Sequence, residues 1–222
     1  SIKQNVYSSG STQQELNLKE GFRNVLAADY NNYYGIDVRE GEHTVVLDGL
    51  AIVRDHTFLT VRGGATLNLK LTGKSYLESG SAPAIHVEQG GTLNLIGGGM
   101  AQSSLALMGG LSAASGATVN FKDCAVYAAG KTIGGTGANV SVENCWISAG
   151  FAGNLRVTRS TLEGEHSGGT VKIDRRSNAN LTDASGKAVT GVTDHSGNPV
   201  YRTKVELEDM NQSRNLMMIT YR

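Results

Sequence analysis

Residues 63–71 read GGATLNLKL, and variants of this phrase return along the chain. The later copies are GGTLNLIG at 90–97, SGATVNFKD at 115–123, TGANVSVEN at 136–144, AGNLRVTRS at 152–160 and SGGTVKIDR at 167–175. Each copy is a turn built on Gly or Asn followed by apolar-polar-apolar alternation. That pattern is typical of a short strand with one buried face.

The first apolar residue of each copy measures the length of each repeat. These residues are Leu67, Leu93, Val119, Val140, Leu155 and Val171, separated by 26, 26, 21, 15 and 16 residues. The second buried residue follows two positions later, at Leu69, Leu95, Phe121, Val142, Val157 and Ile173. A hairpin meander would not bring back the same turn phrase once per repeat, whereas a solenoid does. The sequence therefore predicts an all-β fold, a right-handed parallel β-helix.

The repeats are predicted to fill residues 43–182, and the two ends need covers. An open β-helix would expose unpaired backbone and an apolar core to water. Residues 1–42 are predicted to form an N-terminal cap, with a short amphipathic helix around Leu18–Ala28, or else a degenerate first coil. Residues 183–222 contain the turn SGNP between strand-like runs. They are predicted to form a C-terminal β cap or hairpin, or the start of a second small β module.

Composition limits the classes of partner. The chain has 222 residues, of which 20 are basic and 20 acidic. This balance gives no reason to expect nucleic acid or an anionic membrane as partner. No apolar run approaches the ~18 residues that span a bilayer, so membrane insertion is not expected. The first residues do not form a signal peptide, and the absence of an initial Met indicates a processed or excised piece.

The phrases HTVVLDGLAI (43–52) and GGATLNLKLTGKSYLESGSAPAIHVEQGGTLNLIGGG (63–99) carry a family resemblance. In this order they resemble the repeats of bacterial surface proteins with a carbohydrate-binding, pectate-lyase-like β-helix domain. The resemblance covers residues 43–135 and, more weakly, 196–207. It implies secretion or surface display and binding of polysaccharide, sometimes of acidic sugars, but it supplies no binding residues position by position. After Gly135 the chain departs from these phrases.

Two aromatic residues are the first candidates for a carbohydrate site. The repeat alignment stacks Ala125, Trp146 and Thr161 in one outward column. It stacks Tyr127, Ser148 and Glu163 in the column beside it. Trp146 and Tyr127 could then stack on a pyranose ring, since the C–H face of a sugar packs on an aromatic ring as apolar surfaces do. The alternatives are burial of Trp146 under a neighbouring loop or cap, and an inverted register.

Polar columns beside the aromatic ones complete the predicted site. One contains Asn120, Ser141, Arg156 and Lys172, and the other contains Lys122, Glu143, Thr158 and Asp174. Arg156 and Lys172, with Arg175 and Arg176, form a basic cluster suited to carboxylated sugars, and Glu143 is included with them in the site. The alternative is a solvated face without function. Asn68, Asn94 and Asn120 are predicted to form a structural amide ladder, with a line of contacts to sugar hydroxyls as the alternative.

Cys124 and Cys145 lie 21 residues apart, at one position of adjacent repeats. A buried thiol ladder and a disulfide both remain open for this pair. No metal site is expected, because no second cysteine pair or CxxC motif is present and the histidines lack metal spacing. No cofactor is expected either.

Catalysis is not expected, although Asp123, Glu143, Glu163 and Glu165 could cluster. A lyase could use Lys131, Arg156 or Arg159 as its base. The preferred prediction is a secreted or surface-displayed bacterial protein that binds polysaccharide without cleaving it. A structural adhesin or fibre-type spacer is the first alternative, and a polysaccharide lyase is the second. The sequence leaves oligomerisation open.

Overall fold

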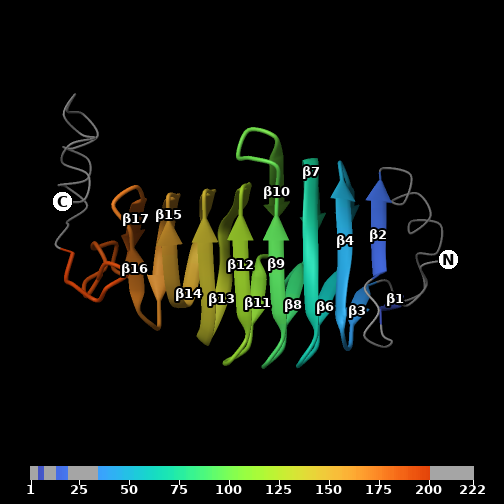
Figure 1. Ribbon diagram of the computed structural model, residues 1–222, viewed down its shortest axis with the longest axis horizontal. Coiled ribbons are helices and arrows are strands. Elements are labelled where there is room, and N and C mark those ends of the chain that lie inside the picture. The colour runs from blue at the N-terminus through green and yellow to red at the C-terminus, as the bar shows by residue number, and fades with distance from the viewer. Residues whose placement is uncertain (1–4, 8–13, 20–34, 201–222) are drawn as a thin grey trace.

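The computed structural model describes residues 5–7, 14–19 and 35–200. The described residues contain strands and no helix, and all 17 strands belong to one sheet. Every named strand pair in this sheet is parallel, for example β4 with β7 and β7 with β9. The strands lie side by side along the longest axis of the molecule (Figure 1). This arrangement is consistent with the predicted parallel β-helix.

The paired strands form three rows, which we name A, B and C. Row A contains β2 (Gln14–Lys19), β4 (Glu42–Asp48), the first part of β7 (Thr66–Glu78), β9 (Thr92–Ile96), β12 (Thr118–Lys122), the last parts of β13 (Ala125–Glu143) and β14 (Trp146–Thr158), and β16 (Val171–Ile173). Row B contains β5 (Ala51–Val53), the end of β7, β10 (Ser103–Leu107), the first parts of β13 and β14, β15 (Thr161–Ser167) and β17 (Asn178–Thr182).

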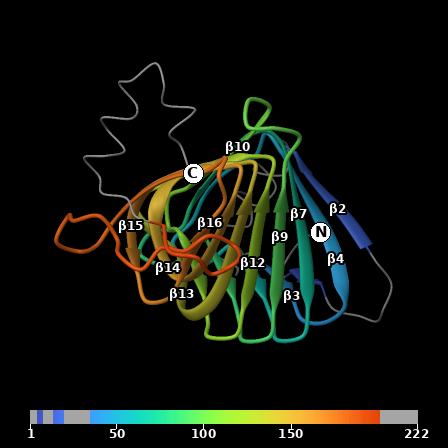
Figure 2. The same ribbon diagram turned by 60° about the vertical axis from the view of Figure 1, so that its left-hand side comes forward.

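Row C contains β1 (Asn5–Tyr7), β3 (Ile36–Val38), β6 (Leu59–Val61), β8 (Ile85–Val87), β11 (Leu111–Ala113), the middle parts of β13 and β14, and the end of β15. Several row A strands can be followed side by side in Figure 2. Between β4 and β15, each repeat of the chain contributes one strand segment to each row.

The register of row A confirms the predicted alignment. Leu67 pairs with Leu93, Leu93 with Val119, and Val119 with Val140. The series continues from Val140 to Leu155 and from Leu155 to Val171. The expected second residues of each copy pair in the same way. The repeat length therefore does shorten from 26 to 21, 15 and 16 residues while row A stays in register.

The inward residues of all three rows form one apolar core. The twelve apolar residues predicted to be buried in row A are each at most 3% exposed. In row B the inward residues Val126, Ile147 and Leu162 are fully buried, as the alternation predicted. Full burial of such a side chain contributes about 1.5–3 kcal/mol relative to its exposed state. Core burial therefore fixes which residues of each strand face outward.

The N-terminal end of the sheet starts earlier than the repeat phrase. β1 pairs with β3 and β2 pairs with β4, both in parallel. The helix predicted around Leu18–Ala28 does not begin at Leu18. The run QELNLK alternates polar and apolar residues and forms strand β2, in which Leu18 pairs with Leu47 of β4. Residues 20–28 lie outside the described residues.

The C-terminal segment 183–200 makes two turns, each closed by an antiparallel bridge. Isolated antiparallel bridges join Thr182 to Ala188 and Thr193 to Pro199, and a parallel bridge joins Thr193 to Lys172 of β16. The second turn therefore lies against the end of row A. The rest of the predicted C-terminal cap, residues 201–222, lies outside the described residues. Across the described residues, no helix has the length and apolar character needed to cross a membrane.

Candidate functional site

The two predicted aromatic residues are exposed on row B. Trp146 lies between Ala125 and Thr161 in the register and is 38% exposed. Tyr127 is 48% exposed and pairs with Ser148. Both side chains point outward because Val126 and Ile147 face the core. The two predicted columns are confirmed, and Trp146 is not covered by the described part of the chain.

A groove on row B, which we name the row B groove, continues the column of Tyr127. Its volume is about 360 Å³. Its lining consists of Gly130, Lys131, Thr132, Ser148, Ala149, Gly150, Phe151, Glu163, Gly164, Glu165 and Ser167. Ser148 and Glu163 belong to the register column that contains Tyr127. A tyrosine, two carboxylates, a lysine and several hydroxyls therefore lie in neighbouring repeats, on row B and where row B meets row C.

Irregular backbone opens this groove. The register between β13 and β14 shifts between Ala128 and Thr132. Gly130 has φ 73° and Gly164 has φ 148°, values in the left-handed region that favour glycine. A Cβ atom on Gly164 would lie 1.6 Å from the carbonyl oxygen of Ala149. The absence of a side chain at this position lets β15 approach β14 closely.

A second groove, which we name the row A groove, lies on the outward face of row A. Its volume is about 470 Å³. Its lining consists of Thr118, Asn120, Asn139, Val140, Ser141, Asn154, Leu155, Arg156, Thr170 and Lys172. The predicted column Asn120, Ser141, Arg156 and Lys172 is confirmed by the register. This groove presents two cations and a set of amide and hydroxyl groups.

Amide hydrogen bonds fix the surface of row A. Asn94 donates to Asn68 over 3.0 Å and Asn120 donates to Asn94 over 2.9 Å, which confirms the predicted ladder. A second, shorter ladder runs beside it, where Asn154 donates to Asn139 over 3.2 Å. The backbone N–H of Thr170 then donates to the side-chain oxygen of Asn154. These contacts hold the amides in fixed positions along the row A groove.

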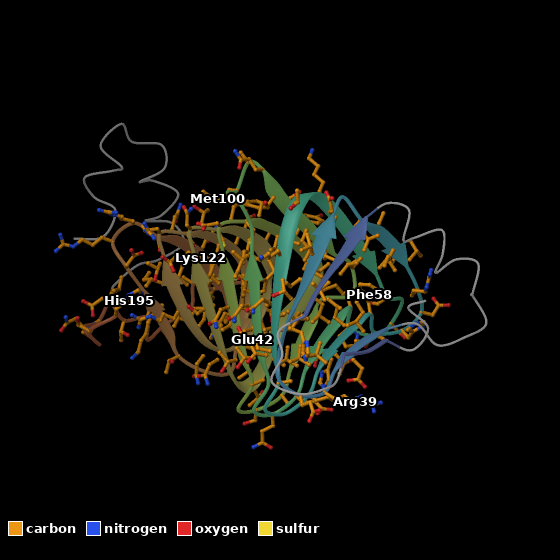
Figure 3. The ribbon with its side chains drawn as sticks, turned by 45° about the vertical axis from the view of Figure 1, so that its right-hand side comes forward. Arg39, Glu42, Phe58, Met100, Lys122 and His195 are labelled. Atoms are coloured by element: carbon orange, nitrogen blue, oxygen red, sulfur yellow. The ribbon has the colours of Figure 1, made fainter. Side chains whose placement is uncertain are left out.

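Arg156 has a partner that comes from the C-terminal segment. Its Nη2 lies 3.2 Å from Nδ1 of His195. The other ring nitrogen of His195, Nε2, lies 2.9 Å from the backbone oxygen of Val157. The turn that carries His195 is closed by Asp194, whose Oδ1 accepts from the backbone N–H groups of Ser196 and Asn198. His195 lies at the C-terminal end of the stack (Figure 3).

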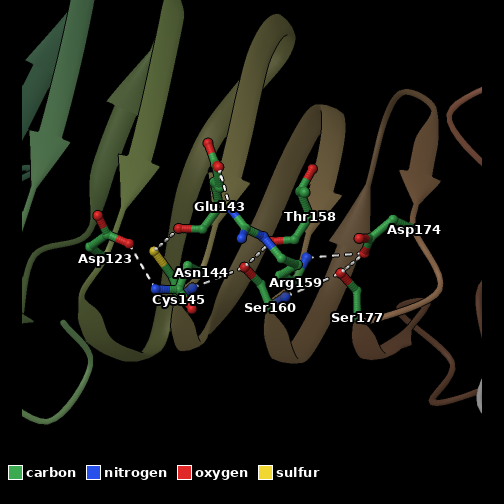
Figure 4. A network of polar contacts seen from close by, with 9 residues as sticks. All are labelled: Asp123, Glu143, Asn144, Cys145, Thr158, Arg159, Ser160, Asp174 and Ser177. Atoms are coloured by element: carbon green, nitrogen blue, oxygen red, sulfur yellow. Dashed lines mark hydrogen bonds and ion pairs between the residues drawn. The ribbon is translucent and has the colours of Figure 1, made fainter.

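A polar ridge separates the two grooves where the chain passes from row A to row B. Asp123, Asn144 and Arg159 occupy equivalent positions with φ of 55°, 51° and 46°. Asn144 donates to Asp123 over 2.7 Å, and Arg159 pairs with Glu143 over 2.6 Å. Figure 4 shows this network continuing through Ser160, Asp174 and Ser177. Glu143 is therefore engaged by Arg159 on the ridge.

The buried column beneath the ridge contains the two cysteines. Cys124 and Cys145 are free, fully buried, and have their sulfur atoms 3.6 Å apart. The hydrogen bond to Cys145, and then burial, raise the pKa of the Cys124 thiol. In this structure the pair forms the thiol ladder, one of the two predicted alternatives.

The five predicted site residues fall in three places. Trp146 and Tyr127 lie on row B, Arg156 and Lys172 line the row A groove, and Glu143 lies on the ridge between them. The predicted acidic cluster also divides. Glu163 and Glu165 share the row B groove with Lys131, whereas Asp123 and Glu143 belong to the ridge.

Two further arginines of the predicted basic cluster follow β16. Arg175 and Arg176 are exposed and do not line the row A groove. Within the described ranges, no three His, Cys, Asp or Glu residues come together as a metal site.

Sequence reasoning did not place His195 in a site, although a signal was present. The run TDASGKAV at 182–189 returns as TDHSGNPV at 193–200. In both copies the Asp side chain accepts from the backbone N–H groups two and four residues later. The first copy has Ala184 where the second has His195. His195 is therefore one of three positions at which the two copies of this turn differ.

Comparison of the chain with protein-family models, with curated proteins and with solved structures found no match.

Proposed function

We propose that the chain is a right-handed parallel β-helix that binds polysaccharide without cleaving it. Connections between parallel strands of one sheet are right-handed in about 98% of cases, which supports the handedness. The observation that carries the function is the exposure of Trp146 and Tyr127 in adjacent repeats beside the row B groove. Exposed aromatic rings next to hydroxyl and carboxylate groups suit the alternating apolar and polar faces of a sugar chain.

The row A groove supports a preference for acidic sugars. Arg156 and Lys172 stack in adjacent repeats and pair in the register. An arginine can bind a carboxylate through two parallel hydrogen bonds, while a lysine adds a point charge. The fixed amides of Asn120, Asn139 and Asn154 offer further hydrogen bonds to sugar hydroxyls. A repeating sugar chain with carboxylate groups fits this chemistry.

The resemblance of residues 43–135 to repeats of bacterial surface proteins supports secretion or surface display. It also supports polysaccharide as the partner, with neither nucleic acid nor membrane insertion involved. A structural adhesin or fibre-type spacer is the alternative, in which the exposed aromatic residues have no ligand. Direct binding measurements distinguish these two functions.

Substitution of Trp146 by alanine tests the proposal. We expect Trp146→Ala to weaken binding to the best polysaccharide on a glycan array about tenfold or more, as loss of a central aromatic contact does. Val53→Ala is the matched control, because Val53 is also an exposed apolar residue of row B, at 48%, in an earlier repeat. Equal binding by wild type and Trp146→Ala would remove Trp146 from the site, and no binding to any glycan would favour the spacer.

A lyase is a second candidate because Lys131, Glu163 and Glu165 line one groove. A lyase needs a base and a means to stabilise the developing carbanion, and a lysine near carboxylates can take part in such proton transfer. Incubation with polygalacturonate, followed by absorbance of unsaturated products, decides between lyase and binding protein. We expect no product. Product formation that Lys131→Ala abolishes would establish the lyase.

A further inference from the structure

We infer that His195 is a positioning residue for Arg156 and makes anion binding in the row A groove stronger in acid. This inference rests on the proposed binding of acidic polysaccharide. The contact joins residues 39 positions apart, with Arg156 Nη2 at 3.2 Å from His195 Nδ1. His195 itself does not line the groove, so it acts through Arg156.

The hydrogen bonds of His195 assign its tautomer. The backbone oxygen of Val157 can only accept, so His195 Nε2, 2.9 Å away, carries the proton that it donates. A guanidinium can only donate, so Nδ1 of the neutral ring accepts from Arg156. The neutral ring therefore uses one donor of Arg156 and holds its guanidinium against the end of row A.

Protonation of His195 changes this contact from attraction to repulsion. The protonated ring carries N–H groups at both nitrogens and can no longer accept from Arg156. Two cations would then face each other at hydrogen-bond distance. An anion in the groove relieves this repulsion by taking the released donors of Arg156, with Lys172 beside it in the register. Binding of the anion and protonation of His195 therefore favour each other.

The other charged groups around His195 are engaged elsewhere. Asp194, on the same turn, accepts from Ser196, Asn198 and the side chain of Asn198. The pKa of Asp194 is lowered, chiefly by the hydrogen bond from the Asn198 side chain. Asp194 therefore stays negatively charged across the pH range in which histidine titrates. Asp174, after β16, accepts from Arg159 and Ser177.

The scaffold under His195 is independent of the imidazole. The first turn of the tandem has the same Asp side-chain contacts and carries the exposed Ala184 at the equivalent position. The second turn is also joined to β16 by backbone hydrogen bonds between Thr193 and Ile173 and between Thr193 and Val171. His195→Ala should therefore leave the turn in place and remove the two contacts of the imidazole, with Arg156 and with the backbone oxygen of Val157.

Binding of polygalacturonate oligomers and of dextran sulfate at about pH 5.5 and at about pH 7.5 tests the inference, because histidine titrates between these values. For the wild type we expect about tenfold tighter binding at the lower pH, the effect of one added charge-assisted hydrogen bond. His195→Ala should bind equally at both pH values. Ala184→His combined with His195→Ala is the matched control and should not restore the dependence.

Four results would overturn the inference. The first is equal binding of the wild type at both pH values, which leaves the proposed function intact. The second is a pH dependence that persists in His195→Ala. The third is a nitrogen NMR spectrum of the neutral ring with the proton on Nδ1, a readout that requires no glycan. Absence of binding to either polyanion at both pH values overturns the acidic preference together with this inference, whereas neutral glycans still test Trp146.

Discussion

Ser160 links three successive repeats at the turn between rows A and B, because it contacts Cys145 in the repeat before it and Ser177 in the repeat after it. Its Oγ donates to the backbone oxygen of Thr158 over 2.8 Å and accepts from the backbone N–H of Cys145 over 3.0 Å. Ser160→Ala would leave the buried N–H of Cys145 without this acceptor. We expect a loss of about 1–3 kcal/mol in the free energy of unfolding, the usual cost of an unsatisfied buried group. Urea unfolding measures it.

Ser160→Cys is the control for this prediction. Cys145, the residue in the same column one repeat earlier, already contacts the carbonyl two residues before it, with its sulfur 3.1 Å from the oxygen of Glu143. A thiol at position 160 can therefore keep part of the contact. We expect Ser160→Cys to lose less stability than Ser160→Ala. Equal losses of unfolding free energy in the two variants would show that Ser160 contributes through packing rather than through hydrogen bonding.

Strands β14 and β15 can approach closely only because Gly164 has no side chain. A Cβ atom at Gly164 would lie 1.6 Å from the backbone oxygen of Ala149, and the residue has φ 148°. Gly164→Ala must move backbone, so we expect a loss of about 3 kcal/mol or more. Gly186→Ala is the control. Its φ is 80° and its Cβ meets nothing within 4 Å, so only the left-handed conformation is penalised, by about 1–2 kcal/mol.

Thermal or urea unfolding of the two glycine variants compares these costs directly. Gly164 lines the row B groove, so Gly164→Ala should also change the shape of the groove. We therefore expect this variant to lose polysaccharide binding as well as stability. Gly186→Ala should leave binding unchanged. A loss in Gly164→Ala no larger than that in Gly186→Ala would mean that β15 can move away from β14 without cost.

The order of strands within a row could be predicted from the sequence, but the grooves could not. Alternation within GGATLNLKL fixes which residues are buried, and equal phrases fix the register from Leu67 to Val171. Alternation says nothing about the angle between rows. The short turn at Asn144 and Cys145 places Glu143 on a ridge and turns Trp146 onto another face. The row B groove depends on a register shift after Ala128 that no periodic pattern reveals.

In the whole molecule, the residues of the predicted site lie on two separate surfaces of different chemistry. Row B offers exposed aromatic rings with two carboxylates and a lysine, whereas row A offers two cations and several amides. The contact of His195 with Arg156 depends on how the C-terminal segment folds back onto row A, which is a tertiary effect. The ridge lies between the two grooves, so we expect variants of the two surfaces to act independently.

The whole chain has no net charge at neutral pH, which bears on how a polyanion would bind. Because 20 basic and 20 acidic residues cancel, no net charge draws a polyanion to the protein. Salt-dependent attraction must then come from local cations, chiefly Arg156 and Lys172. We expect polygalacturonate binding to weaken as salt rises, and Arg156→Gln combined with Lys172→Gln to lose most of that dependence. Isothermal titration at several salt concentrations measures both.

The matched control replaces Arg175 and Arg176 by glutamine, which removes the same charge from exposed positions beyond the row A groove. This variant should keep most of the salt dependence of the wild type, because Arg175 and Arg176 do not line the row A groove. Trp146→Ala should weaken binding to neutral glycans without altering the salt slope. If the control pair abolished the dependence and the groove pair did not, the basic site would lie at the turn after β16 instead of in the row A groove.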